Sequence, residues 1–561
     1  MSSDPRFASI NFTPTPASVP PQGARLSRKP LVNVPVNYHP LNPLSFILRA
    51  ALIYPKQMVY TFSVWAQRIQ NLAYALIKAG IRPGDRVAVI APNSPLIADA
   101  HQGVLAARAV TVPINTRLKH HEVAYILEHS GASLILVDHE YQHLAKDAKV
   151  PVVVSNDTGR SGDPYEEAFS QERGWPGLDT DPDENAAAML CYTSGTTGRP
   201  KGVITTLRGS YLGAVANAFE GQINKDSTYL WILPMFHAAG WTYPWANTFA
   251  FSTQSIIPTY GTTFLHSGVT HYCAAPTVQI GIVNDPQAQK LKRPVVAIIA
   301  GAAPTPHLIG ELEKTGIKPV HVYGLTFEDF ITLIARNPQT YGPFTRCYDQ
   351  EPWKDLSLED RARFMARQGH AFATAEEVRV VAVEEGSDVL VDVPADGKTL
   401  GEIVTRGNIV MKEYFNDPEA TKKAFRGGCF NTGDLAVMHP DGSISVMDRS
   451  KDIIISGGEN ASSLAIEQEL ASHPHVLEVS VIARNHVKWG ERPMAFVILH
   501  HQHVSRWKGR HHEFAADLKA HAKGRLPGFA CPEWVEVVPE LPKTSTGKIL
   551  KTELRKVVAK L

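Results

Sequence analysis

The sequence has few cysteines, and nothing in their arrangement suggests cross-links. Five are spread over the 561 residues, and no two form a Cys-x-x-Cys pair. They are Cys191, Cys273, Cys347, Cys429 and Cys531. An odd, widely spaced set favours neither a disulfide framework nor a zinc site. A reducing compartment is therefore expected.

The chain also lacks an excess of charge of either sign. Lys and Arg number 56 and Asp and Glu number 55, which leaves a formal charge of +1. This balance gives no electrostatic reason to expect nucleic acid or an anionic membrane as a partner. No run of about 18 apolar residues is present, and the N-terminus has no apolar core of the signal-peptide type. We expect a protein without a transmembrane segment that acts on a small molecule.

The chain is too long for a single hydrophobic core. At 561 residues, two or more domains are expected. Residues 1–35 are rich in Pro and Ser and predict a disordered leader. Apolar residues at helical spacing predict a helix from Phe62 to Gly80 that Ser63 caps. From there to about Thr340, short apolar strands alternate with helices, which predicts an α/β fold with two series of parallel βαβ units.

The last third of the chain predicts two smaller units. Short alternating strands from Val378 to Met447, with Asp-Gly turns at 396–397 and 441–442, predict a small β subdomain. The final ~110 residues predict a compact α+β module, by domain-size reasoning. Within it, Ser505 to His512 is basic and is expected to be a solvated loop, because its two histidines lack the spacing of zinc ligands.

A run of hydroxyls and glycines from Tyr192 to Val203 carries the strongest chemical signal. It reads Tyr-Thr-Ser-Gly-Thr-Thr-Gly-Arg-Pro-Lys-Gly-Val. Its glycines allow close backbone approach to phosphate oxygens, and its hydroxyls and Lys201 supply donors and charge. It is not a Walker loop, because Gly202 rather than Ser or Thr follows the lysine. On composition alone it fits either a phosphate-binding loop or a polar surface turn.

Further landmarks follow this run in a fixed order. They are Pro234-Met235-Phe236-His237, Tyr323-Gly324-Leu325-Thr326, Thr432-Gly433-Asp434, Asp448-Arg449-Ser450-Lys451-Asp452, Ser456-Gly457-Gly458-Glu459-Asn460 and Pro542-Lys543-Thr544-Ser545-Thr546-Gly547-Lys548. The ordered set closely resembles the adenylate-forming superfamily, which includes AMP-dependent acyl-CoA synthetases, nonribosomal adenylation domains and luciferases. The resemblance covers nearly the whole chain after residue 40.

The resemblance implies a two-step reaction with ATP, Mg²⁺ and coenzyme A. A carboxylate attacks the α-phosphate of ATP to give an acyl-adenylate and pyrophosphate, and coenzyme A then displaces AMP. The acid is expected to be a medium-chain fatty, branched or aromatic acid. The resemblance also implies an adenylation domain at 36–448, a hinge at 449–451 and a small mobile C-terminal domain at 452–561. Exchange of faces by that domain separates the two steps.

The resemblance assigns roles to individual residues. The β- and γ-phosphates would be held by Thr193, Ser194, Gly195, Thr196, Thr197, Gly198 and Lys201. Adenine would be flanked by Gly301, Ala302, Ala303, Pro304, Tyr323 and Gly324. The α-phosphate would contact Thr326, and the ribose would contact Asp434 and Arg449. The catalytic lysine would be Lys548, which places positive charge where negative charge gathers. The hinge would be at Lys451. The loop that enters the cleft in the second step would contain Gly457, Gly458 and Glu459. His237 would line the acyl or thiol tunnel.

One stretch departs from the superfamily pattern. Relatives carry a metal-binding Glu directly after Tyr-Gly-Leu-Thr, whereas Phe327 holds that place here. Thirteen residues, from Phe327 to Gln339, then precede Thr340-Tyr341-Gly342-Pro343. We expect Glu328, or Asp329 beside it, to bind Mg²⁺. Shorter segments at Tyr54–Tyr60 and Pro258–Ser267, and Ala465 in place of a common acid, are further differences.

Other functions remain open at this point. The chain could be an acid-activating ligase of a secondary-metabolite (toxin) pathway, or a degenerate nucleotide-binding protein without ligase activity. A luciferase-like oxygenase has no supporting feature, because fold likeness does not carry a reaction. The C-terminal Ala559-Lys560-Leu561 is a variant of the Ser-Lys-Leu address, which predicts recognition by the peroxisomal import receptor and a peroxisomal location, with the cytoplasm as the alternative.

Overall fold

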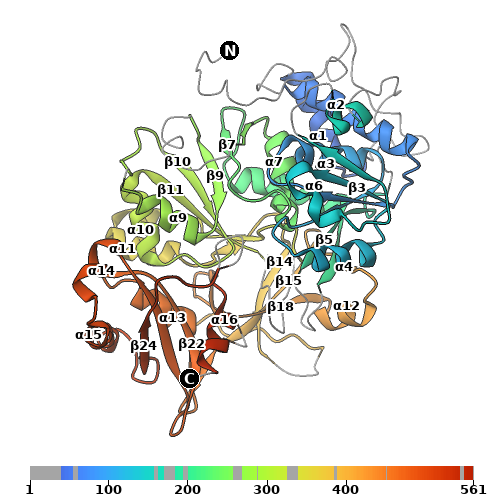
Figure 1. The fold of residues 1–561 in the computed structure, drawn as a ribbon. Helices are drawn as coiled ribbons and strands as arrows, with labels where there is room; N and C mark the ends of the chain where they lie inside the picture. The colour runs from blue at the N-terminus through green and yellow to red at the C-terminus, as the bar shows by residue number, and fades with distance from the viewer. Residues whose placement is uncertain are drawn as a thin grey trace.

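The structure is a computed structural model that describes most of the chain. The described residues are 39–54, 61–156, 162–169, 183–193, 200–256, 268–286, 288–324, 339–383, 388–449, 452–543 and 549–559. The predicted leader therefore lies outside the described residues, as do Thr326, Glu328, Lys451 and Lys548. Figure 1 shows a large N-terminal part with a smaller C-terminal domain, in orange to red, beneath it.

The first sheet has seven strands in the order β16-β6-β5-β2-β1-β3-β4. Their bounds are β1 Arg86–Ile90, β2 Val110–Pro113, β3 Leu134–Asp138, β4 Val152–Ser155, β5 Ala187–Thr193, β6 Lys201–Thr206 and β16 Glu413–Tyr414. The four central pairings among β1, β2, β3, β4 and β5 are parallel, as the alternation of strands and helices predicted. Strands β6 and β16 add an antiparallel edge.

Strand β1 is apolar on both sides, and helices cover both faces of this sheet. Val87 and Val89 pack into one core with helices α1 (Leu44–Ile53), α2 (Phe62–Lys78) and α3 (Pro95–Ala106). Ala88 and Ile90 point the other way, toward α4 (His120–Ser130). Alternate residues of a strand face opposite sides, so a continuous apolar run indicates a strand buried on both faces.

The helix predicted from Phe62 to Gly80 is α2, but its cap differs. The side chain of Thr61 accepts a hydrogen bond from the backbone N–H of Val64 at 3.3 Å. Ser63 lies inside the first turn of the helix, so the prediction of Ser63 as the cap is wrong. The extended backbone at Thr61 is what lets its hydroxyl reach a free N–H of the first turn.

The second sheet has the order β13-β12-β11-β10-β9-β7-β8. Its strands are β7 Thr228–Leu230, β8 Thr253–Ser255, β9 His271–Ala274, β10 Val295–Ile299, β11 Ile317–Tyr323, β12 Thr345–Arg346 and β13 His370–Ala371. One face packs on α10 (Pro306–Thr315) and α11 (Leu358–Met365). The other face shares the main core with α6 (Leu207–Glu220) and α7 (Tyr243–Phe249), so the two sheets have a core in common.

The predicted β subdomain is present as a third sheet, drawn in gold in Figure 1. Its strands are β14 Glu377–Val381, β15 Gly401–Arg406, β17 Phe425–Arg426, β18 Cys429–Met438 and β19 Ile444–Arg449. The turn glycines Gly397 and Gly442 have φ of 68° and 80°, in the left-handed region that glycine adopts without strain. The Asp-Gly signals were therefore correct.

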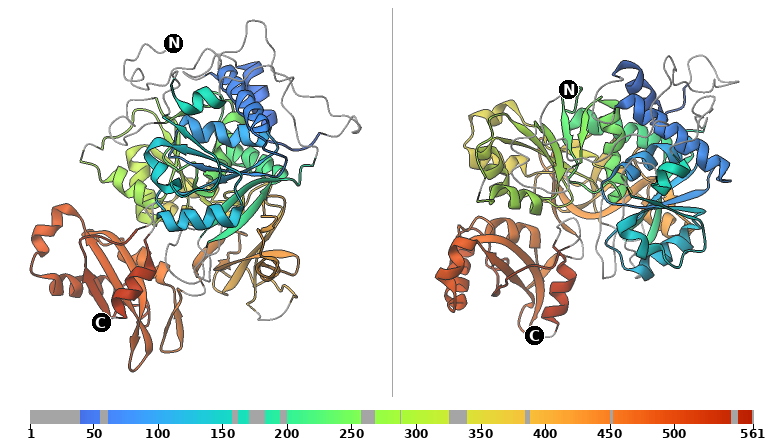
Figure 2. Two further views of the ribbon diagram at one scale, coloured as in Figure 1. Left: turned by 45° about the vertical axis from the view of Figure 1, so that its right-hand side comes forward. Right: turned by 45° about the horizontal axis from the view of Figure 1, so that its top comes forward.

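The C-terminal domain is built on a fourth sheet, in the order β21-β20-β23-β22 with β24 beside β23. Its elements are β20 Ile454–Ser456, β21 Glu459–Ala461, α13 Ser463–Leu470, β22 Val476–His486, β23 Gly490–Leu499, α14 His501–Trp507, α15 His511–Lys523, β24 Trp534–Val537 and α16 Lys551–Val558. Figure 2 shows this domain set apart from the sheets above it in two further views. The α+β class predicted for it is confirmed.

One prediction within this domain is wrong. Ser505 to His512 is not a solvated loop, because it spans the end of α14 and the start of α15. Trp507 explains the difference, since its side chain is buried against Phe514 in the domain core. A single large aromatic anchors the segment, although its neighbours are basic and exposed.

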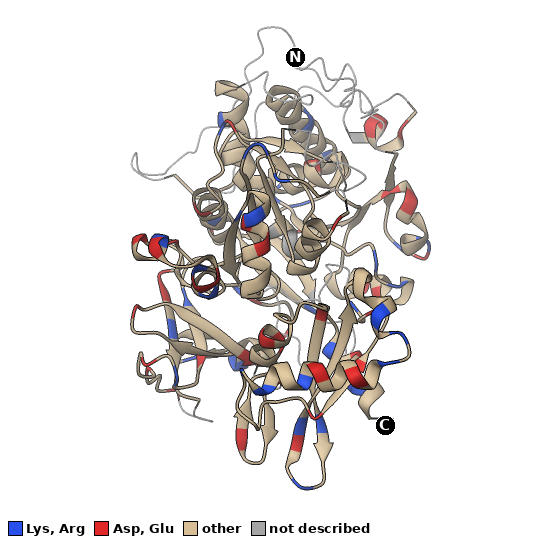
Figure 3. Ribbon diagram, turned by 90° about the vertical axis from the view of Figure 1, so that its left-hand side faces the viewer, with Lys and Arg blue, Asp and Glu red and all other residues tan. Residues whose placement is uncertain are grey.

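Two global expectations can be compared with the described residues. None of the helices among them is both long and apolar enough to cross a lipid bilayer. Figure 3 shows Lys and Arg interspersed with Asp and Glu along the same helices and hairpins, in keeping with the net charge of +1.

Candidate active site

A cavity of about 530 Å³ lies where the C-terminal domain meets the second and third sheets. The residues of the large part that line it include Gly301, Ala302, Ala303, Tyr323, Gly324 and Asp434. The C-terminal domain contributes residues of α13, α16 and the segment between α13 and β22. The volume is within the range of small-molecule sites, which occupy roughly 300–1,000 Å³.

Residues that follow two neighbouring strands line this cavity with their backbone. β10 and β11 are parallel, so their carboxyl ends lie at the same edge of the sheet, where ligands collect in open α/β folds. Gly301 follows β10 with φ of 88°, and the space its Cβ would occupy is open. Gly324 follows β11, where a Cβ would come within 2.5 Å of the carbonyl oxygen of Gly342. Both positions therefore need glycine, the first for its conformation and the second for close approach.

Asp434 and Tyr323 form the polar centre of the cavity wall. The Tyr323 hydroxyl donates a hydrogen bond of 2.5 Å to Oδ2 of Asp434. Asp434 is 7% exposed, and its backbone N–H donates to the hydroxyl of Thr432 at 3.1 Å. Arg449 is its register partner on the adjacent strand β19. A buried carboxylate held in this way can accept hydrogen bonds from the two hydroxyls of a ribose.

The predicted phosphate-binding loop, called the phosphate loop below, connects β5 and β6, and the paired ends of these strands, its two stems, are described. Thr193 ends β5 and is paired with Lys201, which begins β6. The ammonium of Lys201 lies 3.1 Å from Oδ2 of Asp417 and 5.1 Å from the centre of the Tyr414 ring. Residues 194–199, and with them the predicted Ser194, Gly195, Thr196, Thr197 and Gly198, lie outside the described residues. Asp417 and Tyr414 thus hold the Lys201 ammonium beside the second stem.

His237 begins the short helix η4 (His237–Thr242) beyond β7 and is buried. The backbone segment that leads from β7 to His237 is held by hydrogen bonds to Asn93, a residue that the sequence analysis did not single out. The Asn93 carboxamide donates to the carbonyl of Leu233 at 3.0 Å and accepts from the backbone N–H of Met235 at 2.6 Å. Asn93 follows β1 of the first sheet, so it ties the strand ends of the two sheets together. The Asn-Ser-Pro turn after a buried strand was the available signal.

The C-terminal side of the cavity carries a partly buried ionic group that the sequence did not predict. The Lys551 ammonium lies 2.8 Å from Oε1 of Glu467 and donates to the Ser463 hydroxyl at 2.6 Å. Asp448, at the end of β19, accepts from both the N–H and the hydroxyl of Ser463 at 2.7 Å. Burial acts to lower the pKa of Lys551, but Glu467, Asp448 and Asp452 raise it above its ordinary value. The Lys551 ammonium therefore stays protonated, although burial also raises the pKa of Glu467, and these contacts join α16 to α13 and the large part.

Two other predicted elements of the C-terminal domain lie at different places. Ile549, which follows Lys548, lines the cavity, while Lys548 itself lies outside the described residues. Gly457 and Gly458 form the tight turn between β20 and β21, with φ of 65° and 89°, and Glu459 is exposed beside them. In this arrangement Ile549, next to the predicted catalytic lysine, lines the cavity, and the glycine turn is exposed.

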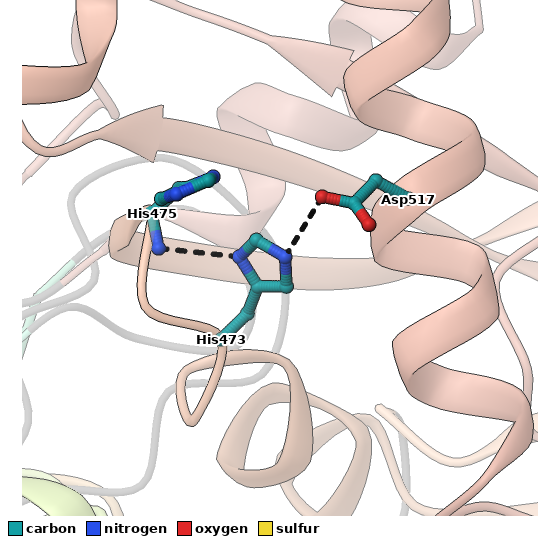
Figure 4. Close-up of side chains that lie close together, drawn as sticks. All are labelled: His473, His475 and Asp517. Atoms are coloured by element: carbon teal, nitrogen blue, oxygen red, sulfur yellow. Dashed lines mark hydrogen bonds and ion pairs between the residues drawn. The ribbon is translucent and has the colours of Figure 1, made fainter.

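A cluster of His473, His475 and Asp517 in this domain has the composition of a metal site (Figure 4). Its hydrogen bonds occupy the nitrogens that would bind a metal. Nδ1 of His473 accepts from the His475 backbone N–H at 3.2 Å, so Nε2 carries the proton toward Asp517 at 3.3 Å. Nδ1 of His475 accepts from the Trp507 indole at 3.1 Å. A neutral imidazole has one acceptor nitrogen, so this is a hydrogen-bonded structural group.

Comparison with known proteins shows the family of the chain. Residues 47–415 match the family described as AMP-binding enzyme, and residues 465–548 match the AMP-binding enzyme C-terminal domain. The chain belongs to the AMP-binding enzyme family. The two matched segments contain all the predicted site residues except six, which lie in the interval between the segments: Asp434, Arg449, Lys451, Gly457, Gly458 and Glu459.

Curated relatives of this AMP-binding enzyme span nearly its whole length. An acetate/butyrate–CoA ligase of Arabidopsis thaliana, named as peroxisomal, is 39% identical over 94% of this chain and 96% of its own. An acetate–CoA ligase of Humulus lupulus is 40% identical over 92% and 95%. A trans-cinnamate–CoA ligase of Petunia hybrida, named as peroxisomal, is 37% identical over 93% and 94%.

Among solved structures, ATP-bound MatB from Rhodopseudomonas palustris superposes with a TM-score of 0.78 at 23% identity, over 92% of this chain and 99% of that one. At that identity the match shows the fold. The α/β fold class and the membership of the adenylate-forming superfamily, both predicted from the sequence, are confirmed, and so is the prediction of an enzyme. The roles of individual residues and the boundaries 1–35, 36–448, 449–451 and 452–561 stay predictions.

Proposed function

We propose that this AMP-binding enzyme is an acid–thiol ligase that forms an acyl-adenylate from a carboxylic acid and ATP and then an acyl-CoA. The observation that carries the proposal is that one cavity is lined both by Gly301–Ala303, Tyr323 and Asp434 and by the start of α16. Curated relatives named as CoA ligases over more than nine-tenths of the chain support it.

Adenosine fits the described wall of this cavity. Gly301 and Gly324 let the backbone approach a flat base, and Asp434 offers a carboxylate to the ribose hydroxyls. The triphosphate would extend toward Lys201. The Lys201 ammonium, which is paired with Asp417, would either leave that carboxylate or bind it together with the phosphates, and would so neutralise phosphate charge. Thr326 would contact the α-phosphate. In phosphoryl and adenylyl transfer such positioning and charge neutralisation supply most of the rate.

The two half-reactions would use two faces of the C-terminal domain. Lys548 would bridge the acid and the phosphates in the first step, which agrees with Ile549 lining the cavity. Rotation about Lys451 would then bring the Gly457-Gly458-Glu459 turn to the cavity for attack by coenzyme A. His237 would line the path of the acyl or thiol group. Glu328 is the residue we propose for Mg²⁺, which would neutralise phosphate charge.

The acid is proposed to be small. Relatives at 39% and 40% identity are named for acetate or butyrate, and others at 36% and 35% for 2-methylpropanoate and benzoate. This range overlaps the branched and aromatic acids expected from the sequence and extends it to shorter chains. A panel from acetate to benzoate therefore brackets the substrate.

We also propose a peroxisomal location. Several relatives are named as peroxisomal, and Ala559 caps the end of α16 as the first residue of the Ala-Lys-Leu address. Lys560 and Leu561 lie outside the described residues. Deleting 559–561 should move a fluorescently tagged protein to the cytosol without changing its activity. An unchanged distribution would refute the address.

The function is tested by incubating purified protein with ATP, Mg²⁺, coenzyme A and each acid, and measuring acyl-CoA and AMP by mass spectrometry. Formation of both products with at least one acid is expected. ATP binding without either product, across the whole panel, would contradict the ligase and favour the degenerate nucleotide-binding alternative.

A further inference from the structure

Both stems of the phosphate loop are held by one face of helix α4. Tyr125 and His129 lie four residues apart, so their side chains project from the same side of the helix. The Tyr125 hydroxyl donates to the carbonyl of Pro200 at 3.1 Å, on the second stem. His129 contacts Tyr192 on the first stem. The helix thus touches the chain just before and just after the loop.

The contact of His129 with Tyr192 is a short hydrogen bond inside an aromatic cage. Tyr192 Oη lies 2.7 Å from Nδ1 of His129. The Tyr192 and Phe415 rings meet the imidazole edge-on, at interplanar angles of 88° and 74°. Burial lowers the pKa of His129, against an opposing effect of Asp417, and burial raises the pKa of Tyr192. The imidazole is therefore neutral, and its Nδ1 accepts a hydrogen bond from the Tyr192 hydroxyl.

The same cage is continuous with the lysine that ends the loop. Phe415 and Asp417 follow strand β16, which pairs with β6, and Asp417 holds the Lys201 ammonium at 3.1 Å. Tyr192 and Gly202 are register partners across the hairpin. A shift of Tyr192 would therefore be passed through the β5–β6 pairing to Lys201.

We propose that His129 is a positioning residue that sets the stems of the phosphate loop for the β- and γ-phosphates of ATP. The proposal rests on the proposed function, since it assigns the loop to ATP. His129 does not touch the nucleotide in this role. Its effect passes through Tyr192 and the hairpin, so it should alter the binding of the triphosphate and leave the adenosine wall at Tyr323 and Asp434 unchanged.

The test compares ATP with AMP binding, measured by titration calorimetry on the full chain. His129→Leu removes the acceptor, Tyr192→Phe removes the donor, and His129→Asn keeps an acceptor near the position of Nδ1. Removing one partner of this part-buried hydrogen bond weakens the arrangement by an amount corresponding to about tenfold in Kd for ATP. His121→Leu, at an exposed position of the same helix, is the matched control.

The expected result is a roughly tenfold rise in the ATP Kd for His129→Leu and for Tyr192→Phe, with the AMP Kd unchanged. The double variant should be no worse than either single variant, His129→Asn should recover most of the loss, and His121→Leu should bind as the unaltered protein does. An unchanged ATP Kd, equal losses for ATP and AMP, or additive effects in the double variant would overturn the proposal.

The binding comparison also separates this proposal from the ligase function. If the unaltered protein binds ATP but forms no acyl-adenylate, the ligase proposal fails, while the positioning role of His129 is still decided by the ATP and AMP affinities. If acyl-adenylate forms and His129→Leu leaves the KM for ATP unchanged, the positioning role fails and the ligase proposal stands.

Discussion

Replacing Arg68 by Met should destabilise the large domain more than any loss of a surface ion pair. Arg68 lies on α2 with 1% of its side chain exposed. Its guanidinium donates to Oδ2 of Asp99 at 3.0 and 2.6 Å and to Oε2 of Glu166 at 2.7 Å. Tyr165 adds a hydrogen bond of 3.1 Å to the same oxygen of Asp99. Three helices are joined through this one side chain.

The magnitude follows from what the substitution leaves behind. Met approximates the length of the arginine stem, so packing changes little and two buried carboxylates lose the guanidinium that both of them bind. Breaking a buried ion pair by removing one partner destabilises a protein by about 3–5 kcal/mol. Burial already raises the pKa of Asp99 despite Arg68. Asp99 should therefore take up a proton in the variant, which limits the loss to about 4 kcal/mol.

Urea unfolding followed by circular dichroism measures this change. Arg363→Met is the matched control, because Arg363 pairs with Glu359 on α11 with 60% and 77% of the side chains exposed. That loss should stay below about 0.5 kcal/mol. A loss below about 1 kcal/mol for Arg68→Met, at unchanged m-value, would refute the reasoning that the cluster is a buried, mutually dependent unit.

Three further predictions concern the site and its support. Asp434→Asn should raise the Kd for both AMP and ATP by roughly tenfold, since charge-assisted hydrogen bonds are worth about 1.5–3 kcal/mol, and calorimetry would contradict the role if AMP binding were unchanged. Lys548→Ala should strongly depress adenylation but spare thioester formation from supplied acyl-adenylate, and equal loss of both would exclude the proposed role. Burial lowers the pKa of His321 to about 4, so its neutral form contributes stability above pH 6.5 that is lost as pH falls toward 4, by up to roughly 3 kcal/mol. His321→Gln should flatten that loss in unfolding measured from pH 7 to 4, and an unchanged slope would contradict it.

Local patterns were sufficient for most of the fold. The continuous apolar runs of β1 and β3 indicate strands buried on both faces, and these strands do pair in parallel. Turn glycines at 397 and 442 were readable because positive φ restricts the residue type. Ser505 to His512 was misread because the burial of Trp507 depends on α15, which packs against it from later in the chain.

The site could be predicted by resemblance but not by local physics. Tyr323 and Asp434 are 111 residues apart and meet only because the end of β11 and the middle of β18 border one cavity. His129 and Tyr192 are 63 residues apart, and no sequence motif predicts that they are in contact. Lys551 and Glu467 act through a tertiary contact with each other, for which a sequence carries no spacing signal. The Asn-Ser-Pro turn marks Asn93 but not the backbone of the second sheet that it binds.

The most direct test of the central claim is acid-dependent exchange of labelled pyrophosphate into ATP by the purified protein with Mg²⁺ and without coenzyme A. Formation of a reversible acyl-adenylate predicts exchange that requires both the protein and one acid of the acetate-to-benzoate panel. Asp434→Asn should reduce the exchange. Absence of acid-dependent exchange from the unaltered, folded protein with every acid of the panel would contradict the claim that this cavity activates carboxylic acids with ATP.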